Sequence, residues 1–275
     1  MTKPAIAWFR RNLRLTDNPS WLAACESGRP LIAVYVSDEL DAGGASRWWL
    51  HGSLASLGES LQAHGVDLVI REGNPVTILS DIVADTGATA LYCSRRFEPE
   101  ARRQEKRLRD TLGDDVERFV YDDYLLRHPK IIKTGSGSAY RVFTPFYRAS
   151  SAAGEPGLPL PAPDAVQAFS GDVDGLALDD LKLLPTKPDW AGGLRSNWEP
   201  GEAGALRQLD EFEGRVAAYA DNRDLPAVDG TSRLSPHLHY GEISPRQTWH
   251  AIRQSGGNDL SGDRAEPFLR QLYWR

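Results

Sequence analysis

The sequence predicts an α/β fold: a doubly wound, mostly parallel five-stranded sheet, Rossmann-like, followed by a long connector and the first part of an all-helical unit. Two observations carry this prediction. Five short apolar runs alternate with helical patterns over the first 125 residues, and only helical patterns appear after residue 200. Parallel neighbours need crossover helices, so the alternation indicates a sheet covered on both faces.

The expected strands are short, apolar and bounded by polar residues, Gly or Pro, as strands buried on both faces are. They are residues 5–9, 31–36, 66–70, 88–92 and 116–121. Between them, helices are expected from the apolar stripe of Trp48, Leu54, Leu57 and Leu61, from residues 76–83, and from the charged stretch 98–112. We therefore expect an α/β domain over residues 1–130.

A connector is expected over residues 131–200, because residues 151–200 hold seven of the eighteen prolines and show little periodicity. The helical unit is expected over residues 201–275. Its helices are indicated by the stripe of Leu206, Leu209, Phe212 and Val216 and by the patterns at 244–254 and 264–275. The last pattern stops without a capping signal, so we expect the chain to end inside a helix of an incomplete domain.

Composition limits the class of protein. The chain has 275 residues, of which 41% are hydrophobic and 25% charged, which is typical of a globular protein. There is no apolar run of about 18 residues and no signal peptide, so we expect a cytoplasmic protein without a membrane segment. Cys25 and Cys93 are too few for a disulfide framework, and no zinc spacing is present, so no metal is expected.

The formal net charge of −6 argues against a general nucleic-acid binder. Its distribution is uneven, however. Residues 124–154 contain no acid and five bases, namely Arg127, Lys130, Lys133, Arg141 and Arg148. The sequence therefore predicts a local positive face, which we call the basic segment.

Two motifs could bind phosphate. Residues 8–19 read W-F-R-R-N-L-R-L-T-D-N-P and follow the first strand, where a parallel sheet places its ligand crevice. No Gly-rich phosphate loop is present, and structural Arg–Asp pairing is the favoured interpretation of these arginines. Residues 231–236, T-S-R-L-S-P, offer hydroxyl and backbone N–H groups at a helix start, with a helix cap as the alternative. Trp274 and Tyr273 would ordinarily be core residues.

Taken together, four stretches resemble the photolyase/cryptochrome flavoprotein family. They are residues 8–19, Y-R-V-F-T-P-F at 140–146, Y-A-D-N-R-D-L-P-A-V-D-G-T-S-R-L-S-P-H-L-H-Y-G-E-I-S-P-R at 219–246 and F-L-R-Q-L-Y-W-R at 268–275. The resemblance implies an α/β domain for an antenna chromophore and an all-helical domain that holds FAD. Family members are longer, which agrees with the expectation of an incomplete helical domain.

The resemblance also implies roles for individual residues. Those matching the FAD-binding positions are Tyr219, Thr231, Ser232, Arg233, Leu234, Ser235 and Arg275. Gln271 and Trp274 match contacts to a flipped-out pyrimidine lesion, and Arg223 matches a position near the DNA backbone. Stacking on an aromatic ring contributes about 1–3 kcal/mol per base, which is a physical reason for Trp at such a place.

The implied activity is that of a deoxyribodipyrimidine photo-lyase, a monomer acting on damaged DNA. Excited reduced FAD gives an electron to a cyclobutane pyrimidine dimer, the ring splits, and the electron returns. The alternatives are a (6-4) photolyase, a blue-light signalling cryptochrome, and a nucleotide-binding α/β protein without photochemistry. The 275 residues alone are expected to bind FAD weakly and to be inactive.

Two departures from the family pattern bear on substrate and antenna. Gln271 stands where dimer photolyases commonly carry Glu, and Gln there is more typical of (6-4) photolyases and some cryptochromes. The sequence of residues 223–235 nevertheless resembles that of bacterial dimer photolyases more closely. Residues 97–102 lack the Asn-Glu pair of folate-binding relatives, so a folate, a deazaflavin or no antenna all remain open.

Overall fold

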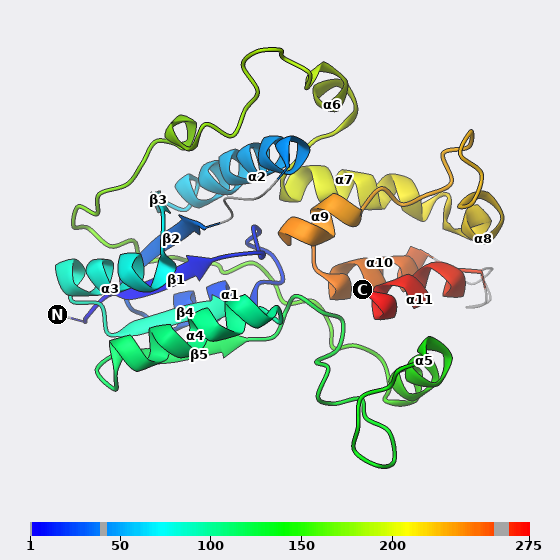
Figure 1. The fold of residues 1–275 in the computed structure, drawn as a ribbon, viewed down its shortest axis with the longest axis horizontal. Coiled ribbons are helices and arrows are strands. Elements are labelled where there is room, and N and C mark those ends of the chain that lie inside the picture. The colour runs from blue at the N-terminus through cyan, green and yellow to red at the C-terminus, as the bar shows by residue number, and fades with distance from the viewer. Residues whose placement is uncertain (1, 39–42, 256–263) are drawn as a thin grey trace.

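The sheet of the computed structural model has the predicted class and strand number (Figure 1). The structure describes residues 2–38, 43–255 and 264–275. The strands are β1 (Ala5–Phe9), β2 (Leu31–Ser37), β3 (Leu68–Glu72), β4 (Ala90–Ser94) and β5 (Glu117–Tyr121). They pair in parallel in the order β3-β2-β1-β4-β5. Two strands, β3 and β4, begin two residues later than predicted.

Helices cover both faces of this sheet because alternate residues of each strand point to opposite sides. On one face, Ala5, Ala7 and Phe9 of β1 pack against α1 (Pro19–Glu26) and α2 (Gly44–Gln62). On the other face, Ile6 and Trp8 pack against α3 (Pro75–Thr86) and α4 (Pro99–Leu112). All five residues of β1 are buried, as expected for a central strand.

The sequence analysis did not predict helix α1 of the α/β unit or helix α5 (Phe143–Ala152) of the connector. Helix α1 begins after Asn18, whose side chain accepts a hydrogen bond from the backbone N–H of Trp21, and Pro19 occupies its first turn. Helix α5 lies inside the region expected to be a connector.

The connector between the two units is otherwise mostly irregular, with η1 (Leu178–Leu181) and α6 (Gly192–Asn197) as its short helical pieces. It is held to the α/β part by backbone hydrogen bonds. The N–H of Leu31 donates to the carbonyl of Gln167 at 2.7 Å, and the N–H of Leu176 donates to the carbonyl of Ile70 at 2.8 Å. These bonds hold parts of the segment against the sheet, whereas the stretch before α6 arches outward above α2 (Figure 1).

The C-terminal unit is helical, as predicted. Its helices are α7 (Glu202–Glu213), η2 (Val216–Ala218), α8 (Tyr219–Asn222), α9 (Ser235–Tyr240), α10 (Pro245–Ser255) and α11 (Glu266–Trp274). They share a core that includes Leu209, Phe212, Val216, Phe268 and Leu272. Leu206 was expected in this core but is 43% exposed, because the buried face of α7 is formed by Gly204, Ala205, Leu209 and Phe212.

A buried polar seam joins the two units through the loop between β1 and α1. Asp17, which is fully buried, accepts hydrogen bonds from the Arg246 guanidinium at 2.5 Å, from the hydroxyl of Ser244 and from the N–H of Leu160. The carboxylate of Glu202 accepts the N–H groups of two residues of the loop, Leu15 and Thr16. The loop is therefore bonded to helical residues that lie more than 180 positions later in the chain.

Two further features of the described residues concern membranes and metals. None of the described helices combines the length and apolarity that a membrane span requires. Within the same residues, no group of three or more His, Cys, Asp and Glu side chains is arranged to hold a metal ion. Cys25 and Cys93 are free thiols, and burial raises the pKa of Cys93 to about 12.

Candidate functional site

The arginines that follow β1 serve structural pairing, as the sequence analysis favoured. The guanidinium of Arg14 is buried and donates to the Asp123 carboxylate at 3.2 Å, to the Asp17 carbonyl at 2.6 Å and to the Gly241 carbonyl at 2.9 Å. Arg10 pairs with Glu105 at 2.6 Å. The guanidinium donors of Arg10 and Arg14 are thus engaged inside the protein.

Burial also affects the acid of this cluster. Removal from water raises the pKa of the Asp123 carboxyl above its ordinary value, while the nearby Arg14 guanidinium acts in the opposite direction. The pair lies within the α/β unit, and Arg14 reaches the helical unit through its bond to the Gly241 carbonyl.

The predicted phosphate loop, residues 231–235, leads into α9. Arg233 adopts a left-handed backbone conformation, with φ of 56°, and donates to the carbonyl of Asn197 at 2.7 Å. Its guanidinium carbon lies 4.2 Å from the centroid of the Trp198 ring. Leu234 is fully buried, whereas Thr231 and Ser235 are exposed.

The hydroxyl groups of residues 231–235 do not cap helix α9, which was the alternative role expected from the sequence. The residue at the N-cap of α9 is Leu234, which has no side-chain capping bond. Ser232 accepts the N–H of Leu234 at 3.3 Å, within the loop and ahead of the helix. The side chains of Thr231 and Ser235 are therefore not needed to start α9.

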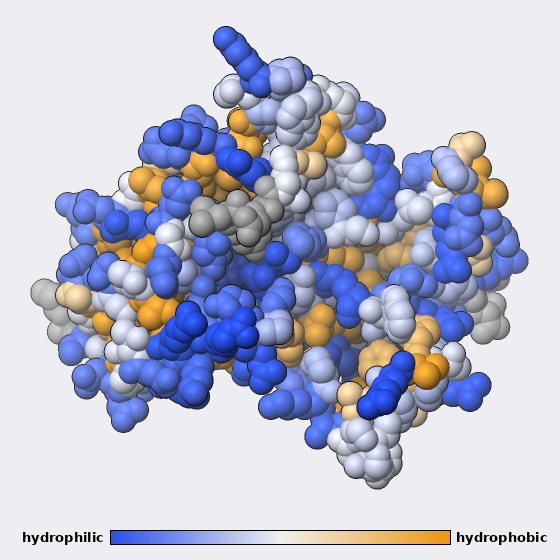
Figure 2. Space-filling model, viewed as in Figure 1, coloured by the Kyte–Doolittle hydropathy of each residue, from blue (hydrophilic) through white to orange (hydrophobic). Residues whose placement is uncertain are grey.

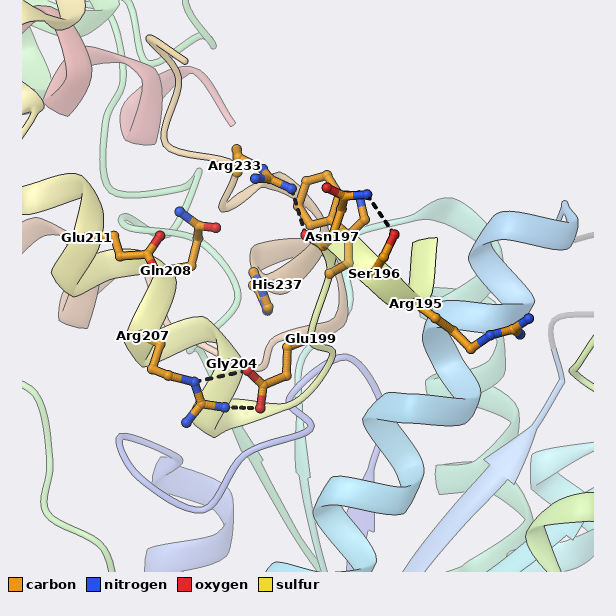
Figure 3. A pocket seen from close by; sticks show the side chains of 11 residues that line it. Arg195, Ser196, Asn197, Glu199, Gly204, Arg207, Gln208, Glu211, Arg233 and His237 are labelled. Carbon is orange, nitrogen blue, oxygen red and sulfur yellow. Dashed lines mark hydrogen bonds and ion pairs between the residues drawn. The ribbon is translucent and has the colours of Figure 1, made fainter. Parts of the chain in front are cut away.

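A cavity of about 580 Å³ lies beside this loop (Figure 3). Three segments line it: residues 195–199 of the connector, one face of α7, and the loop with α9. The lining residues are Arg195, Ser196, Asn197, Trp198, Glu199, Gly204, Arg207, Gln208, Glu211, Arg233 and His237. Arg233 is the residue predicted from the sequence that reaches this cavity.

The polar groups of the cavity are arranged in two sets. Arg207 is paired with Glu199 at one side, while Arg233 and Asn197 lie at the other side (Figure 3). The amide nitrogen of Gln208 is buried and has no hydrogen-bond partner among the described residues. A buried donor without a partner costs about 1–3 kcal/mol, so a ligand with acceptor atoms would stabilise this wall.

Behind the cavity, His237 belongs to a buried polar network that sequence reasoning missed. Its Nδ1 lies 2.5 Å from an oxygen of Glu242, which is fully buried. The other carboxylate oxygen of Glu242 accepts the indole N–H of Trp49 at 3.0 Å and the hydroxyl of Ser53. The network joins α9 to α2 and orients the histidine ring at the cavity wall.

The remaining residues predicted to bind FAD lie outside this cavity. Tyr219 is buried, with its ring 5.4 Å from that of Phe268. Arg275 donates to the carbonyl of Tyr124 at 2.8 Å and to that of Leu238, and burial lowers its pKa. The described residues therefore do not gather the whole predicted set around a single cavity.

The predicted lesion contacts lie on the surface of α11. Trp274 is 64% exposed, so the alternative role as a core residue is wrong. Gln271 is also exposed, and its amide approaches the carbonyl of Pro267 at 3.4 Å. Arg223, on the C-terminal side of α8, is exposed and pairs with Asp224 at 3.5 Å.

Helix α5 packs beside α11 and supports the exposed indole. The rings of Phe143 and Trp274 form a T-shaped contact with centroids 4.6 Å apart, and the Tyr147 and Tyr273 rings are 5.5 Å apart. The Arg270 guanidinium lies 5.6 Å from the Phe143 ring centroid. Sequence reasoning missed these partners, although Phe143 lies four residues before Tyr147 and Arg270 four before Trp274, a spacing that places each pair on one helix face.

This arrangement brings the basic segment next to the predicted lesion contacts. Helix α5 belongs to the basic segment. Four of the five bases of this segment are exposed, namely Lys130, Lys133, Arg141 and Arg148. The fifth, Arg127, is half-buried and donates to the carbonyl of Gly154. An exposed aromatic ring beside exposed cations is the combination that proteins use for single-stranded or flipped-out bases.

Fold and site together define a two-part protein, with a doubly wound α/β unit joined to a helical unit that carries an aromatic and cationic surface. The DNA photolyase family model matches residues 5–164, which is more than half of the chain, and the chain belongs to this family.

Individual relatives extend the similarity to the whole chain. The deoxyribodipyrimidine photo-lyase of Agrobacterium fabrum is 42% identical over all of this chain and 58% of its own length. Cryptochrome-1 of Arabidopsis thaliana is 32% identical over 98% of this chain and 41% of its own. The crystal structure of a bacterial class III photolyase from Agrobacterium tumefaciens superposes with a TM-score of 0.95 at 41% identity, again over all of this chain and 58% of the other. The chain thus spans less than two thirds of these relatives.

Proposed function

We propose that this chain acts in light-dependent DNA repair, in the splitting of cyclobutane pyrimidine dimers, as a deoxyribodipyrimidine photo-lyase with FAD as its cofactor. The observation that supports this most directly is the exposed Trp274, held by Phe143 next to the basic segment. A large exposed aromatic ring is suited to receive a base that has left its stack.

The cavity beside residues 231–235 fits the phosphate portion of such a cofactor. Arg233 lies at its wall, and the unpartnered amide nitrogen of Gln208 is a donor that phosphate oxygens could satisfy. A charge-assisted hydrogen bond from Arg233 would contribute about 1.5–3 kcal/mol. When bound, reduced FAD supplies the photoexcited electron that opens the cyclobutane ring and is returned after cleavage.

The residues of α11 would position the lesion. Trp274 would stack against the flipped-out pyrimidines, and Gln271 would offer both a donor and an acceptor to their polar edge. Exposed bases such as Arg141 and Arg148 would meet the phosphates of the flanking strand. None of these steps requires a general base or a nucleophile from the protein.

Lesion binding in the dark tests the DNA part of this proposal. Trp274→Ala should weaken binding of an oligonucleotide with one cyclobutane dimer by about 5- to 150-fold, the equivalent of one stacking contact. Trp190→Ala is the matched control, because Trp190 is a 47% exposed tryptophan of the connector, away from α11. Equal losses in both variants would contradict the assignment.

The reaction itself is tested with the protein that carries this chain, purified with its flavin and given each lesion separately under blue light. Repair of cyclobutane dimers supports the proposal. Repair of (6-4) lesions alone would make it a (6-4) photolyase, and flavin bands without repair would make it a cryptochrome. Absence of flavin bands would favour a nucleotide-binding α/β protein without photochemistry.

The (6-4) or signalling alternatives are kept because of Gln271 and the similarity to Cryptochrome-1 of Arabidopsis thaliana. The antenna is equally a matter for experiment: a folate, a deazaflavin or no second chromophore fits residues 97–102. The absorption spectrum of the protein distinguishes these three cases.

A further inference from the structure

A second positively charged surface lies on the α/β unit, far from α11 in the sequence. It is an open groove of about 750 Å³ along α4 and the edge strand β5. Figure 2 shows strongly hydrophilic residues over α4. The lining residues are Arg95, Phe97, Pro99, Arg102, Arg103, Glu105, Lys106, Arg109, Arg118 and Val120. Six of these ten side chains are cations and one is an acid.

The acid of the groove, Glu105, lies 4.0 Å from one of these cations, Arg95, which also pairs with Asp122 at 2.8 Å. Glu105 is held by the buried Arg10 guanidinium at 2.6 Å and by the backbone N–H of Arg96 at 3.2 Å. Its charge is therefore already matched by a partner inside the protein.

The cations themselves are largely available to a ligand. Arg102 and Lys106 are exposed and have no ion-pair partner among the residues that the structure describes. Arg103 and Arg109 pair with Glu100 and Asp110, but both pairs are exposed, and exposed pairs contribute only about 0–1 kcal/mol. A polyanion could replace these partners at little cost.

Their spacing adds to the argument. Arg102, Lys106 and Arg109 are four and three residues apart, so they follow one face of α4 over about 10 Å. Like charges at this spacing destabilise a helix by a few tenths of a kcal/mol per pair, so the stripe brings the fold no benefit. A strand of duplex DNA presents about three phosphates over that length.

We propose that the groove between α4 and β5 binds the phosphate backbone of DNA as a second, sequence-independent contact surface. It lies outside the lesion-binding surface, and it rests on the proposed function only in taking DNA as the partner. Guanidinium and ammonium groups recognise phosphate without reading bases, so this contact is salt-dependent and does not distinguish damaged from undamaged DNA.

The test measures binding of the 275-residue chain to a labelled, undamaged 20-base-pair duplex by fluorescence anisotropy over a salt series. Each lost phosphate contact reduces the slope of log affinity against log salt by about 0.9, which is about eightfold in affinity at 0.1 M salt. Lys106→Gln should lose one contact, and Arg102→Gln with Lys106→Gln should lose two.

Arg107→Gln is the matched control, because Arg107 is the exposed neighbour of Lys106 on the same helix but does not line the groove. Its slope should equal that of the unchanged chain. Equal slope changes for Lys106→Gln and Arg107→Gln would overturn the proposal, since the effect would then be one of net charge.

Two further outcomes would also overturn it. One is that the unchanged chain does not bind the duplex. The other is that the groove variants lose affinity only for tripolyphosphate, measured by calorimetry, which would make the groove a site for small polyphosphates. Neither outcome touches the proposed function, which is decided by flavin content, lesion repair and the Trp274→Ala comparison.

Discussion

At Arg233 the structural role of the side chain can be distinguished from a ligand-binding role. In the structure its guanidinium donates to one carbonyl, that of Asn197, and lies over the ring of the half-buried Trp198. Such a cation–π contact contributes about 0.5–1 kcal/mol at an exposed site. The protein thus gains little stability from this residue, and a phosphate ligand would gain more.

We therefore predict that Arg233→Ala weakens FAD binding by about 10- to 150-fold, equivalent to a charge-assisted hydrogen bond. The melting temperature of the flavin-free protein should change little. Arg195→Ala is the control, because Arg195 lines the same cavity but pairs with Asp189. A large loss of stability in the flavin-free Arg233 variant would assign this residue a structural role.

At Gln271 the prediction concerns pH. An amide has no titratable proton, so lesion binding by the unchanged protein should show no pKa from this position. Gln271→Glu should introduce one, with binding that changes between about pH 4 and 6 as the carboxyl ionises. The measurement is lesion affinity across that range in both proteins, and identical profiles would mean that Gln271 does not contact the lesion.

At the scale of elements, the end of α9 depends on the close approach of two segments. Gly241 ends this helix with φ of +68°, and a Cβ there would lie 2.0 Å from the carbonyl oxygen of Arg11. Helix α3 ends on Gly87, which has the same φ but no atom within 4 Å of a Cβ. The two glycines differ in their surroundings and share their backbone conformation.

This pair makes a controlled experiment possible. Gly87→Ala should cost about 1–2 kcal/mol, the cost of a left-handed conformation for a residue with a Cβ. Gly241→Ala should cost clearly more, because the loop before α1 must also move away. Urea unfolding of both variants gives the comparison, and equal costs would show that the seam can adjust to a methyl group.

Helix α4 begins after Glu98, whose carboxylate accepts hydrogen bonds from Arg96 at 2.9 to 3.2 Å. Partial burial would raise the pKa of this carboxyl, but the bonds from Arg96 and from the backbone outweigh it and lower the pKa to about 2. A lowered pKa in the folded state means that the contribution to stability is present above the ordinary range of Glu and is lost as the pH falls toward 2.

We accordingly expect Glu98→Gln to reduce the free energy of unfolding at pH 7 and to have a much smaller effect at about pH 2, where about half of the Glu98 carboxyl groups are protonated in the folded state. Urea titrations of both proteins at pH 7, 4 and 2 measure the difference. A difference that persists unchanged at pH 2 would show that the carboxylate charge is not its cause.

At the scale of the whole molecule, the seam makes the two units depend on each other. Asp17, on the loop after β1, is buried and paired with Arg246 of the helical unit. Leaving a buried charge without its partner costs about 3–5 kcal/mol. The Asp17–Arg246 pair of the seam therefore contributes more to holding the two units together than any exposed ion pair in the described residues.

Arg246→Gln, which leaves the fully buried Asp17 without its cation, should lower the free energy of unfolding by about 3 kcal/mol or more. Asp189→Asn, in an exposed pair with Arg195, should lower it only slightly. Tryptophan fluorescence and far-UV circular dichroism should coincide on unfolding of the unchanged chain. A loss of similar size in both variants would contradict the coupling assigned to the seam.

The sequence by itself determined the elements whose signal is local. Strands β1, β2 and β5 fall within one residue of their predicted ranges, because an apolar run marks a strand that is buried on both faces. Strands β3 and β4 begin two residues late, since Val66 and Ala88 are buried before strand pairing begins. The family resemblance, which the comparisons confirmed, also came from local motifs.

The tertiary structure alone decided which side chains meet. Arg14 pairs with Asp123, 109 residues away in the same unit, and its bond to the Gly241 carbonyl depends on how the two units pack. Trp274 is exposed, and its ring packs in a T-shaped contact with Phe143 of α5, a helix that the sequence analysis missed. The physical reason is that periodicity reports a residue's neighbours along the chain, whereas burial, charge pairing and cavities depend on segments that only the packed chain brings together.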